Sequence, residues 1–402
     1  MAETKDVILV LNTGSSSLKC TVYEAGSHAV KIAHATASNI GLTHATLKIE
    51  DADDASEIPL AAADHGEALQ MVVVWLRENT PMKDVVAVGH RVVHGGPKLK
   101  EVEHITESVL KELHRIAEFD AEHIKVELEI IHAAQELYPN ALHVACFDTG
   151  FFRDLPDRAQ RLPIPRRYSE KGLKRYGFHG LSYQYLYGAL QKVSGDDLQT
   201  KRVVFAHLGS GASMCAVKNG AVIDTTMGLT PAGGIPMSTR SGDIDPGVAV
   251  FLVKHEHMDA DELNDIFNFQ SGLLGMSGTT PDMKVLLEQE AIDPRAHEAV
   301  EAFCYQVKKT IGAYAAAMGG LDYIVISGGM GEQAPKIRWR ICEGLEFLGV
   351  RLGQGANDAA KELISLPEST VSVYVLPTDE WATIYDGVQK IMDKVNKKEG
   401  SV

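Results

Sequence analysis

The sequence predicts an α/β protein built from a duplicated domain. In each half of the chain, a strand-rich stretch leads into segments in which helices alternate with further strands, a pattern typical of α/β domains. The chain has 402 residues, which is long for a single hydrophobic core and predicts two domains. The strand–turn–strand segment VILVLNTGSSSLKCTVYEAG at 7–26 recurs as VVFAHLGSGASMCAVKNG at 203–220, with Gly14 and Cys20 matched by Gly209 and Cys215 at a constant separation. This repeat, half a chain apart, indicates duplication.

The first half predicts a strand meander that leads into a mixed segment of helices and strands. Short apolar runs separated by turn residues indicate the antiparallel meander. Apolar residues at helical spacing then alternate with two further strands. The expected strands cover 7–12, 18–24, 29–35, 45–50, 85–93 and 141–147, and the expected helices cover 64–77, 106–118 and 121–137.

The second half repeats the hairpin and ends in long helices. Residues 151–180 are rich in Arg, Pro and Gly and are expected to be irregular. Apolar stripes over 294–318 and 380–395 predict helices that pack in the core or at a subunit interface rather than on a cofactor. We expect an N-terminal domain over 1–150, a C-terminal domain over 151–385, and a tail over 386–402 that packs back on the first domain.

Composition narrows the range of partners and locations. The formal net charge of −15 argues against nucleic acid or an anionic membrane as the main partner. No apolar run reaches the roughly 18 residues of a membrane span, and the N-terminus lacks the apolar core of a signal peptide. The five cysteines are scattered, without a CxxC pair, so we expect reduced core thiols in a cytoplasmic protein.

Three glycine-rich turns are candidate phosphate sites. The Gly-Ser turns of the two related hairpins offer backbone N–H groups and hydroxyls to an anion, although neither has the GxxxxGK[ST] pattern of a P-loop. Two such hairpins could grip a phosphate chain between them, but each hairpin taken alone is better explained as an ordinary Gly-Ser turn. The third turn, GGMG at 328–331, follows a predicted strand at 323–327 and suits either close approach to a nucleotide or a tight strand-to-helix connection.

Several polar residues stand where chemistry or structural pairing would need them. Arg91 lies within an apolar strand and requires an anionic partner if buried. Arg240 lies in TRSGDIDPG, and arginine is the best planar fork for carboxylate or phosphate. Asp148 follows a strand, where the active sites of open α/β sheets lie. His179 could donate to a transferring phosphoryl group. Structural ion pairs and a core histidine are the alternatives.

The ordered set of motifs resembles the acetate kinase (acetate/propionate kinase) family. The blocks run from residue 9 to about 380: LVLNTGSSSLK, GHRVVHGG, FDTGF, RYGFHG, HLGSGAS, MGLTP, TRSGDIDP, SGLLGMSG and ISGGMGE. The resemblance implies duplicated actin/hexokinase/Hsp70-like (ribonuclease H-like, βββαβα) domains with a central active-site cleft. It also implies reversible phosphoryl transfer between ATP and acetate or propionate, with Mg²⁺ or Mn²⁺, by a homodimer.

The resemblance also implies a role for each matching residue. Arg91, Asp148, His179 and Arg240 would be catalytic, with Arg91 also binding the carboxylate. Asn12 and Glu380 would organise the metal ion. The nucleotide would be bound by Lys19, His207, Leu208, Gly209, Ser210, Gly211, Asp282, Met283, Lys284, Gly329, Met330, Gly331, Glu332 and Gln333. The remaining substrate contacts would be Val93, His123, Phe178 and Pro231.

Departures from the family pattern occur in the second phosphate hairpin and around the alkyl pocket. Ser210 stands where the family has Asn, and Glu122 stands where the family has an apolar pocket residue. A carboxylate in the pocket would repel a carboxylate substrate, so Glu122 is expected to point away or the substrate to differ. The alternatives are therefore a kinase of the same fold for butyrate or a branched acid and, more remotely, an actin- or Hsp70-type ATPase.

Overall fold

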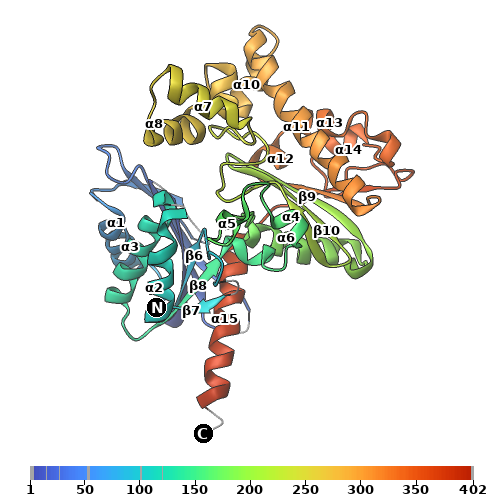
Figure 1. Cartoon of the computed structure of the whole chain (residues 1–402). Coiled ribbons are helices and arrows are strands. Elements are labelled where there is room, and N and C mark those ends of the chain that lie inside the picture. Colours follow the sequence, from blue (N-terminus) through green and yellow to red (C-terminus); the bar gives the residue numbers. More distant parts are fainter. Residues whose placement is uncertain are drawn as a thin grey trace. The chain divides into compact units, whose positions relative to one another are not determined.

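The computed structural model describes residues 4–14, 16–26, 28–51, 55–99, 102–119 and 121–399. The chain forms two compact units (Figure 1). The first contains the residues up to Arg153 and those from Asp379 onward, and the second is Asp154–Thr378. The second division therefore falls just before the last helix, α15 (Glu380–Glu399), and not inside it at 385 as expected from the sequence.

The first unit is built on an eight-stranded sheet in the order β5-β4-β3-β2-β1-β6-β8-β7. Strands β1 to β5 form an antiparallel meander, and β6 and β8 continue the sheet parallel to β1. The strands are β1 (Lys5–Gly14), β2 (Ser17–Glu24), β3 (Lys31–Ser38), β4 (Thr46–Asp51), β5 (Ala55–Pro59), β6 (Met82–Val92), β7 (Glu103–His104) and β8 (Leu142–Phe147).

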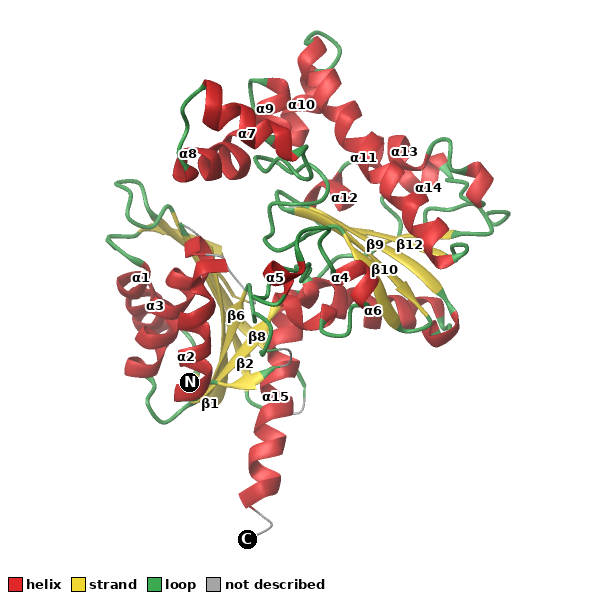
Figure 2. Ribbon diagram, viewed as in Figure 1, coloured by secondary structure: helices red, strands yellow, loops and turns green. Residues whose placement is uncertain are grey.

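Helices cover both faces of this sheet. One face is covered by α1 (His65–Asn79), α2 (Glu107–Ile116) and α3 (Ala121–Leu137), and the other by α15 (Figure 2). Gly89 in β6 makes the close approach of α15 feasible, because an added Cβ there would lie 2.6 Å from Ile384 and 2.7 Å from Val388. The packing of α15 on β6 explains why the last helix belongs to the first unit.

The second unit contains a five-stranded sheet in the order β11-β10-β9-β12-β13. Its strands are β9 (Arg202–Leu208), β10 (Ala212–Lys218), β11 (Ala221–Thr225), β12 (Tyr323–Ser327) and β13 (Ser372–Val375). Its helices are α4 (Asp157–Gln160), α5 (Arg166–Ser169), α6 (Gly180–Ser194), α7 (Pro246–His255), α8 (Ala260–Asp265), α9 (Gly272–Ser277), α10 (Met283–Gln289), α11 (Pro294–Met318), α12 (Gly329–Gln333), α13 (Pro335–Cys342) and α14 (Gln354–Asp358).

The two sheets share one topology, which confirms the predicted duplication. The order β3-β2-β1-β6-β8 in the first unit corresponds to β11-β10-β9-β12-β13 in the second. In both, an antiparallel three-stranded meander is followed by two strands parallel to its first strand. Cys20 in β2 and Cys215 in β10 are both completely buried. All five cysteines are free and buried, as expected of core thiols.

Most of the elements expected from periodicity are present, and the differences have simple causes. Strand β5 was not predicted from the sequence. All of its residues are exposed, so it lacks an alternating apolar pattern. The segment 151–180, expected to be irregular, contains α4 and α5, each a single turn long. Among the described residues, none of the helices is both long and apolar enough to cross a membrane.

Candidate active site

The first unit gathers polar side chains at one end of its central strands. Asn12 in β1 and Lys19 in β2 are directly paired across the first hairpin. Arg91, near the end of β6, donates from Nη1 to Asn12 Oδ1 at 3.1 Å. The adjacent strands thus bring an amide, an ammonium and a guanidinium together beside the first glycine turn.

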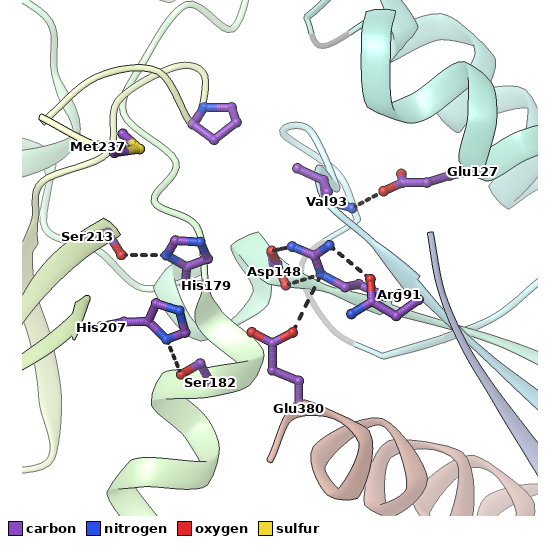
Figure 3. A network of polar contacts seen from close by, with 12 residues as sticks. Arg91, Val93, Glu127, Asp148, His179, Ser182, His207, Ser213, Met237 and Glu380 are labelled. Atoms are coloured by element: carbon purple, nitrogen blue, oxygen red, sulfur yellow. Dashed lines mark hydrogen bonds and ion pairs between the residues drawn. The ribbon is translucent and has the colours of Figure 1, made fainter. Parts of the chain in front are cut away.

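Two carboxylates surround Arg91 (Figure 3). Arg91 donates from Nη2 to Asp148 Oδ2 at 2.6 Å and from Nε to Asp148 Oδ1 at 3.3 Å. Glu380 Oε2 lies 4.0 Å from the same Nε, so it is an ion-pair partner without a hydrogen bond. One positive charge therefore faces two negative charges at a site where Asp148 is only 1% exposed.

The pKa values reflect this imbalance. Burial alone would lower the pKa of Arg91, but Asp148 and Glu380 more than offset it and the pKa is raised. Burial raises the pKa of Glu380, Asp148 raises it further, and Arg91 opposes both. Glu380 is thus the carboxylate with the least compensation, and an added cation would favour its charged form.

The turn after β6 fixes the position of Asp148. Gly95 donates its N–H to Thr149 Oγ1 at 3.1 Å, which ties this turn to the residue after Asp148. An added Cβ at Gly95 would lie 2.0 Å from the carbonyl oxygen of Leu99, so the position requires glycine. The N–H of Val93 donates to Glu127 Oε1 at 3.0 Å.

In the second unit, two predicted catalytic residues meet at the second glycine hairpin. Gly209, Ser210 and Gly211 connect β9 to β10, and the N–H of Gly209 donates to the carbonyl of Gly211 at 3.1 Å. An added Cβ at Gly211 would lie 3.3 Å from His179 Nε2 and 3.7 Å from Arg240 Nη1. Both side chains therefore reach the turn that was predicted to hold phosphate.

His179 is held in a left-handed conformation at the start of α6. Its φ of 59° is uncommon for a residue other than glycine and costs on the order of 1 kcal/mol. Its Nδ1 lies 2.8 Å from Ser213 Oγ, and its ring stacks on His207 at a centroid distance of 4.5 Å (Figure 3). His207 Nδ1 in turn lies 2.8 Å from Ser182 Oγ. These partners fix both imidazoles beside the second glycine hairpin.

The third glycine turn packs directly against the second. Gly328 has a φ of +81°, and an added Cβ would lie 2.7 Å from the carbonyl carbon of Leu208. Arg338, which is completely buried, donates from Nη1 to the carbonyls of Gly331 and Glu332, both at 2.8 Å. The backbone of the strand-to-helix connection at Gly328 therefore packs directly on the backbone of the second hairpin at Leu208.

The other predicted site residues have more varied environments. Phe178 is completely buried and Val93 is 3% exposed. The carbonyl of Pro231 accepts from Arg240 Nη1 at 3.4 Å. Asp282 caps α10 by accepting a hydrogen bond from the N–H of Lys284 at 2.8 Å, and Met283 in the same helix is buried. Residues 329–333 form α12, and His123 lies in α3. Ser15 of the first hairpin and the side chain of Glu122 lie outside the described residues.

Sequence reasoning missed the residues that support this site. Ser213, Ser182, Glu127 and Arg338 contact predicted site residues or their backbone. The first three lie 25 to 34 residues from their partners, whereas Arg338 lies in the helix that directly follows α12. Trp381 was assigned to an apolar stripe, yet its ring lies beside Lys19. An apolar stripe at helical spacing gave no signal that one of its members faces a cation.

The oxygen ligands around Arg91 suit a hard cation. Asn12, Asp148 and Glu380 offer amide and carboxylate oxygens, which are the ligands Mg²⁺ prefers. The surplus negative charge at Glu380 supports the same conclusion. In the part of the chain that the structure describes, no three His, Cys, Asp or Glu side chains form a metal cluster. Such an ion would therefore rely on few protein ligands, which is typical of Mg²⁺ bound together with phosphates.

Comparisons with known proteins agree with the fold. The Acetokinase family model matches residues 7–386. An acetate kinase of Rhodopseudomonas palustris is 40% identical over 395 residues, which cover 96% of this chain and 99% of that protein. The crystal structure of Porphyromonas gingivalis acetate kinase has a TM-score of 0.89 and 34% identity, covering 96% of this chain and 100% of that one. A Francisella tularensis propionate kinase has a TM-score of 0.91 and 31% identity, covering 96% and 99%.

These findings first define a class. The chain is an ATP-dependent phosphotransferase with a short-chain carboxylate as acceptor. Within that class it belongs to the acetokinase family, as its motifs predicted. Membership implies ATP and ADP as co-substrates and a metal ion.

Proposed function

We propose that this enzyme converts ATP and acetate or propionate reversibly to ADP and the acyl phosphate, by direct in-line transfer with Mg²⁺. The observation that carries this proposal is the bonding of Arg91. A guanidinium has five N–H donors, and three of those of Arg91 are used by Asp148 and Asn12. Among the residues that the structure describes, one N–H on each terminal nitrogen has no partner, which matches the bidentate geometry of a substrate carboxylate.

Phosphoryl transfer to a carboxylate requires compensation of negative charge and does not require a general base. A carboxylate is already ionised at neutral pH, so the obstacle is repulsion between two anions. We propose that Arg91 orients the carboxylate and that Asp148 holds Arg91 in position. His179 and Arg240 stabilise the transferring phosphoryl group from the second glycine hairpin. Bound Mg²⁺ would supply further charge neutralisation at the phosphates, held through Asn12 and Glu380.

The remaining proposed roles concern binding. Lys19 and the residues 207–211 bind the nucleotide phosphates, because both stand at glycine hairpins of the duplicated fold. Asp282, Met283, Lys284 and residues 329–333 bind the adenosine part. Val93, His123, Phe178 and Pro231 are the other proposed contacts of the carboxylate substrate. The choice between acetate and propionate lies with this last group.

The decisive experiment is an acyl phosphate assay. The purified protein is incubated with ATP, Mg²⁺ and hydroxylamine, which traps acyl phosphate as a hydroxamate. Acetate, propionate and butyrate are compared in parallel at equal concentration. We expect hydroxamate with acetate or propionate in preference to butyrate. Formation only with butyrate would favour the kinase for longer acids, and no hydroxamate with any acid would refute the proposal.

Glu380→Gln is expected to raise the Mg²⁺ concentration required for half-maximal activity by about 10-fold or more. The substitution removes the less compensated carboxylate of the Arg91 site but keeps its size. Activity is titrated with Mg²⁺ and with Mn²⁺ at saturating ATP. Asp386→Asn, a carboxylate lost from the same helix, is the matched control and should leave the requirement unchanged. An unaltered Mg²⁺ dependence in Glu380→Gln would remove this residue from the proposed metal site.

We further propose that the enzyme is a homodimer that associates through α7. This helix has no buried residue, and Val248, Val250, Phe251 and Val253 are each 43–55% exposed. An apolar helix without a single buried side chain is costly unless another surface covers it. A second copy of the chain is the expected occupant because the family resemblance implies a homodimer.

Phe251→Glu is accordingly expected to shift the protein from dimer to monomer. Sedimentation equilibrium over a 100-fold concentration range (roughly 0.1–10 μM) measures the change, because a buried charge at an interface should weaken association by at least about 10-fold. Ile292→Glu, at a residue that is 86% exposed outside α7, is the control. If both variants sediment as the unmodified protein does, α7 is not the interface.

A further inference from the structure

We propose that Trp381 is a positioning residue for Lys19. The indole would hold the ammonium beside the first glycine hairpin, where the proposed function places the nucleotide phosphates. The inference rests on that proposed role of Lys19. It assigns to Trp381 no contact with substrate, only with the lysine.

The first step is the contact itself. Lys19 Nζ lies 5.9 Å from the centroid of the Trp381 ring, within the range of a cation–π interaction. Lys19 has no hydrogen bond or ion pair with any residue that the structure describes. Besides the ring, it interacts with the charge of Glu380, whose pKa it helps to lower. A long side chain without a hydrogen bond or ion pair samples many rotamers. The ring therefore narrows the positions of the charge without consuming an N–H donor.

The second step is that the ring is itself fixed. Trp381 contacts His34 edge to face, with a centroid distance of 5.0 Å and an interplanar angle of 75°. Thr21 Oγ1 lies 2.8 Å from His34 Nδ1, and Thr36 Oγ1 lies 3.2 Å from Nε2. Both ring nitrogens of His34 are thus engaged. Burial lowers the pKa of His34 to about 4, and the lysines nearby lower it too, so the imidazole is neutral near pH 7. The neutral imidazole therefore does not compete with Lys19 for the indole.

The third step is that packing alone does not account for an indole here. Trp381 Nε1 is buried and has no hydrogen-bond partner among the described residues. A buried donor without an acceptor is unfavourable, and phenylalanine or leucine would avoid the problem. Indole, however, is the aromatic group that binds a cation best. The ring also directly follows Glu380 at the start of α15, so it adjoins the proposed metal ligand.

The expected consequence is a selective effect on ATP. Trp381→Leu should raise the KM for ATP about 3- to 5-fold, the range of a partly exposed cation–π interaction. The KM for acetate should change less than 2-fold, because Arg91 makes the carboxylate site. Trp381→Phe keeps an aromatic face and should recover most of the ATP affinity. Trp75→Leu, in α1, controls for the loss of an indole elsewhere in the same unit.

A spectroscopic readout separates positioning from structural support. The chain has three tryptophans, so Trp75→Phe with Trp339→Phe leaves Trp381 as the sole indole. ATP titration should then change its fluorescence, and adding Lys19→Met should abolish that change. Binding is measured without turnover, so this arm remains valid even if no acyl phosphate is formed and the proposed function fails.

Three results would overturn the inference. One is a KM for ATP in Trp381→Leu equal to that of the unmodified enzyme. Another is an equal rise of both KM values with no recovery in Trp381→Phe, which would indicate structural support only. The third is a Trp381 fluorescence response to ATP that persists in Lys19→Met.

Discussion

Arg240→Ala is expected to lower kcat by about 10³-fold or more while ATP binds with near-normal affinity. Arg240 Nη1 and His179 Nε2 both lie close to the Cβ position of Gly211, at the second glycine hairpin. The hairpin amides and residues 329–333, which we propose bind the nucleotide, remain when the arginine is gone. The charge that develops on the transferring phosphoryl group loses its planar donor, and that loss appears in the transition state.

The measurement pairs kinetics with binding. Initial rates at saturating ATP and acetate give kcat, and calorimetric titration with ADP gives the nucleotide affinity. Arg240→Lys retains the charge without the fork and should recover only part of the rate. Arg167→Ala removes an exposed arginine that lies over Tyr168 and serves as the control. A kcat within 10-fold of normal in Arg240→Ala would contradict the proposed role.

The features that the sequence predicted best are those encoded over short stretches. A few consecutive residues encode each of these features: the two glycine hairpins, the His-Gly-Gly turn after β6, and Asp148 after β8. Duplication made them more conspicuous, because Gly14 and Gly209 occupy equivalent hairpins of the two sheets. Local sequence was sufficient there because turn geometry depends on a few neighbouring residues.

The features that sequence reasoning missed depend on contacts between distant segments. Trp381 looks like one apolar residue of a helix until α15 is packed against β2 and β3. Arg338 looks like a surface residue of α13, yet it is buried, bonds to Asn357 in α14 and fixes the backbone of α12. The position of α15 also depends on a contact between distant segments, because the helix packs on β6 only where Gly89 has no side chain. Each of these depends on tertiary packing, which a periodic pattern does not encode.

Asp148→Ala is expected both to abolish activity and to destabilise the first unit. The substitution leaves Arg91 largely buried, with Asn12 as its remaining hydrogen-bond partner and Glu380 at 4.0 Å. Removing one member of a buried ion pair typically costs 3–5 kcal/mol, so we expect about 3 kcal/mol here, with Glu380 offsetting part of the loss. Activity should fall by more than about 10³-fold, because Arg91 loses the orientation that presents its free N–H groups to the carboxylate.

A double-mutant cycle tests whether the unpaired charge is the cause. Asp148→Ala, Arg91→Met and the double variant are unfolded in urea, and the unfolding of each unit is followed separately. If the buried guanidinium is responsible, the double variant is more stable than Asp148→Ala alone, because methionine leaves no charge to compensate. Additive losses would instead mean that Asp148 acts through its other contacts at the end of β8. In either case the double variant should be inactive, since the proposed carboxylate site requires Arg91, and stability and catalysis are thereby separated at one ion pair.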